Sequence, residues 1–176
     1  MQATFTSQDV EELLRELARR LNAVGVAGGI RVVGGAAIAL LNSDRRATQD
    51  IDALLLPDGP VRDIAAQIGR ERGLPSDWIN DAAKAYVPPV GLEDWHEVFR
   101  EGEMVVYVGS LQMLLAMKVY ANRGRRDTPD IEFLLDQCQI TSLEQVQEIY
   151  ERYHAQDVIT DSAAARIRAW LERRGA

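Results

Sequence analysis

Two aspartates one residue apart, Asp50 and Asp52, are the pair whose type and spacing best suit chemistry in this sequence. They open a predicted strand, and side chains alternate across a strand, so both carboxylates point to one face while Ile51 points to the other. The Cα atoms of such a pair lie about 6.5–7 Å apart. Because carboxylates at that spacing can share one divalent cation or bridge two, Asp50 and Asp52 are predicted metal ligands.

A pair of glycines, Gly34 and Gly35, precedes the aspartates. The pair follows a short apolar strand predicted near residues 30–33 and leads into a short helix predicted near residues 36–41. Glycine lets the backbone approach a ligand closely, and the N–H groups at a helix start attract phosphate. The sequence therefore predicts a phosphate site facing the two carboxylates, as a metal-dependent enzyme that uses nucleotides requires.

The glycine pair, the helix and the segment Thr48-Gln49-Asp50-Ile51-Asp52 together resemble the signature of the DNA polymerase beta-like nucleotidyltransferase superfamily. The resemblance implies that the glycine turn holds a nucleoside triphosphate and that the two aspartates bind catalytic Mg²⁺. Many members carry serine after the glycines, whereas this chain has Ala36, so backbone N–H groups alone would bind the phosphate. Many also have a third carboxylate on a later strand, and the sequence assigns none here.

A lysine, Lys118, lies within the apolar helix that Ser110 is predicted to cap, and the segment Arg125-Arg126-Asp127-Thr128-Pro129-Asp130 follows it. These residues resemble the nucleotidyltransferase-type toxins of bacterial toxin–antitoxin systems and a related uncharacterised bacterial branch. With the glycine and aspartate segments, the resemblance extends from about residue 30 to residue 135. It implies that Lys118 neutralises charge on the phosphates and that Asp127 or Asp130 orients Lys118 or an arginine.

A structural interpretation of the same residues stays open. A lysine on an apolar stripe commonly extends its ammonium group to the surface. Asp127 also suits the N-cap of a following helix, and Asp130 suits its first turn, where the helix dipole favours an acid.

Length and composition indicate a single domain covering residues 1–176, with a core at about 25–110 and a helical portion at about 110–176. The sequence predicts an α/β (α+β) fold with a small mixed sheet, flanking helices and a nucleotidyltransferase-like architecture. Strands are expected near residues 30–34, 51–56, 96–100 and 104–109. Helices are expected at 7–24, about 61–72 and 78–86, from Ser110, and at 142–154 and 160–174.

Charge and cysteine content narrow the function classes. The net charge of −7 argues against a broad nucleic-acid-binding surface, although Arg45, Arg46 and the arginines after Lys118 allow a local basic pocket. One cysteine, Cys138, and two histidines exclude an internal disulfide and the usual zinc sites. No apolar run approaches the ~20 residues of a membrane span, so we expect a cytoplasmic protein without a membrane partner.

The leading hypothesis is a Mg²⁺-dependent nucleotidyltransferase that moves a nucleotide from an NTP to a hydroxyl group. Its acceptor would be the 3′ end of tRNA, a protein or a small hydroxylated molecule, and a cognate antitoxin is a possible protein partner. The alternative, from another class, is a catalytically silent nucleotide-binding or protein-interaction module on the same scaffold.

Overall fold

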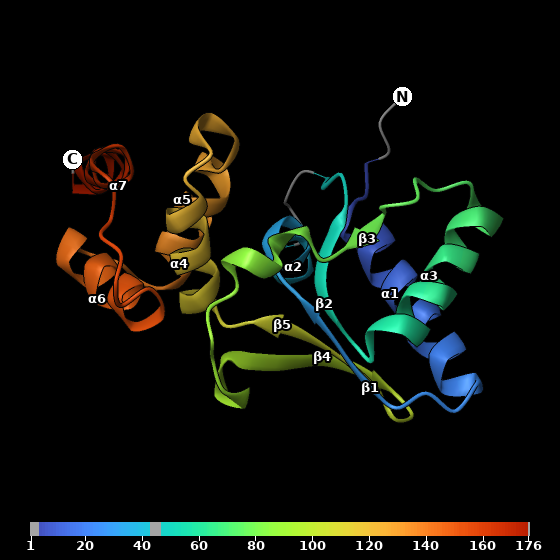
Figure 1. Cartoon of the computed structure of the whole chain (residues 1–176). Helices are drawn as coiled ribbons and strands as arrows, with labels where there is room; N and C mark the ends of the chain where they lie inside the picture. The colour runs from blue at the N-terminus through green and yellow to red at the C-terminus, as the bar shows by residue number, and fades with distance from the viewer. Residues whose placement is uncertain (1–3, 43–46, 176) are drawn as a thin grey trace. The chain divides into compact units, whose positions relative to one another are not determined.

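The computed structural model describes residues 4–42 and 47–175, which form two compact units (Figure 1). Unit 1 comprises Met1–Ala85 and Trp95–Gly109, and unit 2 comprises Tyr86–Asp94 and Ser110–Ala176. The basic residues Arg45 and Arg46, named above for a local pocket, lie outside the described residues.

Unit 1 is built on a five-stranded mixed sheet in the order β3-β2-β1-β5-β4. Its strands are β1 (Gly28–Val32), β2 (Ile51–Leu56), β3 (Ile79–Asn80), β4 (Trp95–Glu101) and β5 (Met104–Gly109). β1 pairs antiparallel with β2 and parallel with β5, while β3 pairs parallel with β2 and β4 antiparallel with β5. The predicted mixed α/β fold is confirmed.

The pattern of burial along β2 explains how this strand presents a carboxylate. Ile51, Ala53 and Leu55 are buried, whereas Asp52 and Leu54 are partly exposed, as alternation across a half-buried strand requires. Ile51 therefore belongs to the core and Asp52 to the opposite face, as the sequence predicted.

The α-helices that the structure describes in unit 1 are α1 (Ser7–Ala23), α2 (Gly34–Leu41) and α3 (Asp58–Arg72). α1 contacts both α2 and α3, and its amphipathic face buries Leu14 and Leu17. The start of α3 differs from the expected residue 61. Pro57 occupies the N-cap, and Pro60 lies in the first turn, where its missing N–H costs no hydrogen bond.

The helix expected at residues 78–86 is wrong. The segment instead forms the short strand β3, followed by the 3₁₀ helix η1 (Ala82–Tyr86). The N–H of Ile51 donates to the carbonyl of Trp78 at 2.8 Å, and Ile79 pairs with Ile51. The segment therefore pairs with β2 as the fifth strand of the sheet. The Oδ1 of Asn80 accepts from the N–H of Ala82 at 2.8 Å, a local bond that competes with helix formation.

Unit 2 is helical, which confirms the helical C-terminal portion (Figure 1). Its elements are η2 (Leu92–Asp94), α4 (Leu111–Ala121), η3 (Gly124–Arg126), α5 (Thr128–Gln137), α6 (Leu143–Tyr153) and α7 (Asp161–Gly175). The predicted caps are confirmed for two helices: the hydroxyl of Ser110 accepts from Met113 N–H, and Ser142 forms a capping box with Gln145.

Residues 86–94 precede the β4–β5 hairpin in the chain but belong to the helical unit. The carbonyl of Asp94 accepts from Ser110 N–H at 2.8 Å. Its Oδ1 accepts from the hydroxyls of Ser110 and Tyr153 at 2.9 and 2.6 Å. The carboxylate of Asp94 therefore joins the start of α4 to the end of α6.

Among the helices of residues 4–42 and 47–175, none has the length and apolarity needed to cross a membrane.

Candidate functional site

Asp52 and Gly34 meet directly in unit 1. A Cβ atom placed on Gly34 would lie 2.8 Å from Oδ2 of Asp52, which is closer than real Cβ atoms approach an oxygen. Gly34 also has a φ of 64°, in the left-handed region that favours glycine. In addition, Val33 N–H donates to the carbonyl of Asp52 at 2.9 Å. The two motifs that the sequence singled out therefore come together, with the carboxylate against the backbone of the glycine turn.

The start of α2 is the second part of this site. Gly34 is the first residue of α2, and its N-cap, Val33, provides no side-chain hydrogen bond. The first N–H groups of a helix have no partner within the helix and carry the positive end of its dipole. Gly35 is in the first turn and Ala36 is buried, so backbone groups rather than a hydroxyl are offered to an anion here.

Asp50 lies just before β2 and is held by its neighbours. Its carbonyl accepts from the hydroxyl of Thr48 at 3.1 Å, and its Oδ2 accepts from Nδ2 of Asn80 at 3.2 Å. Thr48 in turn forms a two-bond antiparallel bridge with Phe5. Among the residues that the structure describes, Oδ1 of Asp50 accepts no hydrogen bond, so this atom remains available as a ligand.

The donor set of unit 1 fits Mg²⁺. This ion is usually held by one or two carboxylates together with substrate phosphates and water, rather than by a cage of protein ligands. Asp50 and Asp52 provide two partly exposed carboxylates, and the start of α2 beside them suits the phosphates. Within residues 4–42 and 47–175, no group of three His, Cys, Asp or Glu residues is arranged to hold a metal.

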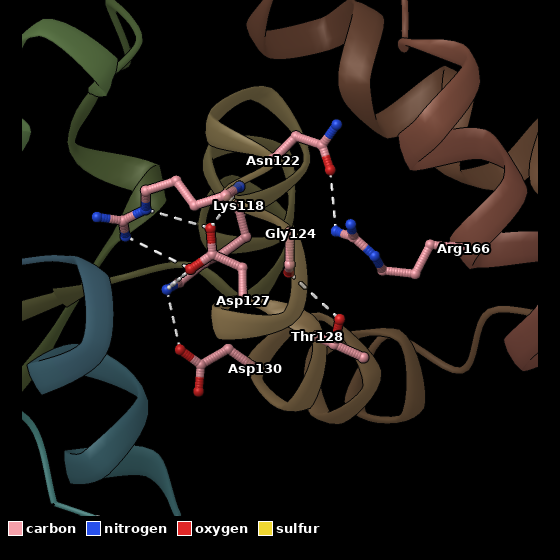
Figure 2. Close-up of polar contacts among 8 residues, drawn as sticks. Lys118, Asn122, Gly124, Asp127, Thr128, Asp130 and Arg166 are labelled. Atoms are coloured by element: carbon pink, nitrogen blue, oxygen red, sulfur yellow. Dashed lines mark hydrogen bonds and ion pairs between the residues drawn. The ribbon is translucent and has the colours of Figure 1, made fainter.

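Lys118 and Asp127 lie in unit 2, in a buried ion cluster (Figure 2). Nζ of Lys118 is 2.9 Å from Oδ1 of Asp127 and 2.9 Å from Oδ2 of Asp130. Lys118 is 6% exposed and Asp127 1% exposed. The lysine therefore does not extend to the surface as the structural interpretation proposed; it is clamped between two aspartates.

Asp127 occupies the N-cap position of α5, but its side chain makes no capping bond. Its Oδ2 instead accepts two hydrogen bonds from Arg123, one from the backbone N–H at 3.0 Å and one from the side-chain Nε at 3.2 Å. Burial raises the pKa of Asp127, but the charge of Lys118 and the hydrogen bonds from Lys118 and Arg123 outweigh it, so the pKa lies below the usual 3.8. Asp127 is thus an anion that orders a lysine and an arginine together.

The predicted site residues fall into two groups. The structure brings Gly34 and Asp52 together in unit 1 and Lys118 and Asp127 together in unit 2. It adds Asn80, which falls in the segment expected to be a helix at 78–86 and instead lies on β3, where its amide donates to Asp50. The stretch from Leu74 to Asp81 is unusually rich in aromatic and polar side chains for a connector, and this is the feature of the sequence that could have pointed to Asn80.

Comparison with known protein families points to the nucleotidyltransferases as a class. The chain belongs to the family described as "Nucleotidyltransferase of unknown function (DUF6036)", whose model matches residues 8–172. The match covers both the glycine and aspartate motifs of unit 1 and the ion cluster of unit 2. No curated protein and no solved structure matches the chain.

Proposed function

We propose that this protein is a Mg²⁺-dependent nucleotidyltransferase that transfers a nucleotide from an NTP to a hydroxyl acceptor. The observation that carries the proposal is the contact between the Asp52 carboxylate and Gly34 at the start of α2, with Asp50 two residues away. Membership of a nucleotidyltransferase family supports it independently.

The four site residues of unit 1, Gly34, Gly35, Asp50 and Asp52, each have a defined task in this proposal. Asp50 and Asp52 hold Mg²⁺, which when bound neutralises phosphate charge and lowers the pKa of the attacking hydroxyl. The N–H groups of Gly34 and Gly35 receive the phosphate oxygens. Holding the triphosphate in this way aligns the α-phosphorus for in-line attack, with pyrophosphate as the leaving group.

Lys118 keeps in this proposal the role that the resemblance implies, which is to neutralise phosphate charge, and Asp127 positions its ammonium group within unit 2. An ammonium group has three N–H donors, and the two aspartates around Lys118 engage two of them. The geometry supports the positioning role, because Asp127 contacts both Lys118 and Arg123.

The acceptor is the 3′ end of tRNA, a protein or a small hydroxylated molecule. The net charge of −7 favours a small molecule or a confined contact with RNA over a broad nucleic-acid surface. A toxin role with a cognate antitoxin belongs to this proposal, as does a cytoplasmic location, where NTPs are available.

The test offers α-labelled NTPs, one at a time, with total tRNA, with protein and with small aminoglycosides. We expect Mg²⁺-dependent label transfer to one acceptor, abolished by EDTA and by the double variant Asp50→Asn/Asp52→Asn. Absence of transfer to every acceptor, including the protein itself, would contradict the proposal.

A second candidate is a silent nucleotide-binding or protein-interaction module. Two observations favour it: Ala36 stands where many members of the superfamily that the sequence resembles have serine, and Lys118 is enclosed by two carboxylates. Calorimetry with Mg²⁺–NTP separates the candidates. Tight binding without turnover supports the module, and absence of binding leaves a role in protein interaction.

A further inference from the structure

Asn80 is the polar side chain that β3 places beside the two aspartates. β3 runs parallel to β2, and Asn80 is paired in register with Asp52. Its Nδ2 donates to Oδ2 of Asp50 at 3.2 Å, across 30 residues of sequence. Asn80 therefore borders both carboxylates, one through strand register and the other through a hydrogen bond.

The orientation of the Asn80 amide is set by its other contacts. Its Oδ1 accepts from Ala82 N–H at 2.8 Å, and its Nδ2 also donates to the carbonyl of Asp77 at 3.2 Å. An amide whose oxygen already accepts a backbone hydrogen bond presents its NH₂ group to Asp50. The donor, and not the acceptor, consequently faces the carboxylate.

The segment that carries Asn80 is anchored on both sides. Before it, Trp78 is 1% exposed and its indole N–H donates to the carbonyl of Ala65 in α3 at 3.0 Å. After it, Asp81 pairs with Arg62 of α3 at 2.9 Å. A donor on such a braced segment can hold another side chain in place, because its own position is determined by packing and hydrogen bonds.

We infer that Asn80 is a positioning residue of the metal centre: its amide holds Oδ2 of Asp50 and directs Oδ1 of Asp50 to the cation. This inference rests on the proposed function. The amide contributes a hydrogen bond without a third negative charge, which limits repulsion among the carboxylates when no metal is bound. Asn80 thereby sets the affinity for Mg²⁺ without being a ligand.

The experiment measures the melting temperature of the full chain against Mg²⁺ concentration for the wild type, Asn80→Ala and Asn80→Asp. We expect Asn80→Ala to weaken Mg²⁺ affinity by about 10–100-fold, as loss of a residue that orients a metal ligand typically does. Asn80→Asp should melt earlier than the wild type without metal and gain more stability from Mg²⁺. The matched control is Asn22→Ala, which removes another asparagine whose Oδ1 accepts a backbone hydrogen bond, from Glu103, in unit 1.

The outcomes separate this inference from the proposed function. A merely structural Asn80 predicts that Asn80→Ala lowers the melting temperature equally with and without Mg²⁺ and leaves the Mg²⁺ midpoint unchanged, which would overturn the inference alone. A wild type that gains no stability from Mg²⁺ overturns the metal site and the inference together. If Asn80→Ala does not fold, Asn80→Asp decides: a gain from Mg²⁺ no larger than that of the wild type overturns the inference.

Discussion

At the scale of single residues, Gly34 has two independent reasons to be glycine. Its φ of 64° is strained for any other residue, and a Cβ would collide with Oδ2 of Asp52. Gly73, which has a φ of 65°, has only the first reason, because a Cβ at this position would meet nothing within 4 Å. The two glycines therefore allow backbone strain to be separated from displacement of the carboxylate.

We expect Gly34→Ala to destabilise the protein by more than Gly73→Ala, which should cost about 1 kcal/mol from backbone strain alone. Gly34→Ala should also abolish the gain in melting temperature on adding Mg²⁺ and NTP, since Asp52 has to move. Gly73→Ala should keep that gain. Denaturant unfolding and ligand-dependent melting of both variants check this. Equal effects of the two substitutions would show that the Gly34–Asp52 contact has no role in binding.

The Asp52→Asn substitution tests the metal role directly. It keeps the size of the side chain but removes a charge, so Mg²⁺-dependent transfer should fall by orders of magnitude while stability without metal holds or rises. Ile51→Asn, on the buried face, should do the reverse and destabilise by about 1–3 kcal/mol. Early melting of Asp52→Asn with unchanged nucleotide binding would instead indicate that Asp52 is a structural ion-pair partner.

At the scale of elements, the Lys118 cluster joins α4 to the start of α5. Lys118→Met leaves Asp127 and Asp130 buried without their shared cation, and such a loss typically costs about 3–5 kcal/mol. Arg123→Ala is the control, because this side chain is 51% exposed and exposed ion pairs contribute about 1 kcal/mol or less. Urea unfolding measures both. If Lys118→Met is as stable as the wild type but has lost nucleotide transfer, Lys118 acts in the reaction and does not stabilise the fold.

The lowered pKa of Asp127 leads to a prediction of how the stability of unit 2 changes in acid. Its pKa is lower in the folded state than the usual 3.8, so the unfolded chain takes up the proton first as the pH falls. The stabilisation is therefore complete above about pH 4 and is lost as the pH falls through the lower, folded pKa. Hydrogen exchange of α4 and α5 should show this loss in the wild type and a smaller one in Asp127→Asn. Asp136→Asn, at an exposed ion pair with Arg174, should behave like the wild type.

The elements that were predicted well from the sequence are those whose formation depends on residues close together in the chain. The amphipathic period of α1, the alternation in β2 and the capping box of α6 all lie within a few residues. The prediction for the segment that forms β3 failed because a two-residue strand is too short to show an alternating pattern of apolar residues. This strand exists only through its pairing with β2. The hydrogen bond from Asn80 to Asp50 could not be predicted for the same reason, because the two residues are 30 positions apart in the sequence.

At the scale of the whole molecule, the prediction of one domain can be tested against the two compact units. We expect a single cooperative unfolding transition, because the chain passes between the units more than once. Trp170 in α7 reports on unit 2 when Trp78 and Trp95 of unit 1 are replaced by Phe, and far-ultraviolet circular dichroism reports on both units. Coincident transitions confirm one domain, and separate midpoints would show two.

The placement of residues 86–94 has a consequence for how this gene can be divided. A stop codon after Gly109 would leave Asp94 on the shortened product while removing Ser110 and Tyr153, which donate to it. A fragment beginning at Ser110 would lack Asp94. No single crossover point in the gene therefore separates the two units. A recombination event that exchanges the helical unit has to include residues 86–94 or keep an aspartate at position 94.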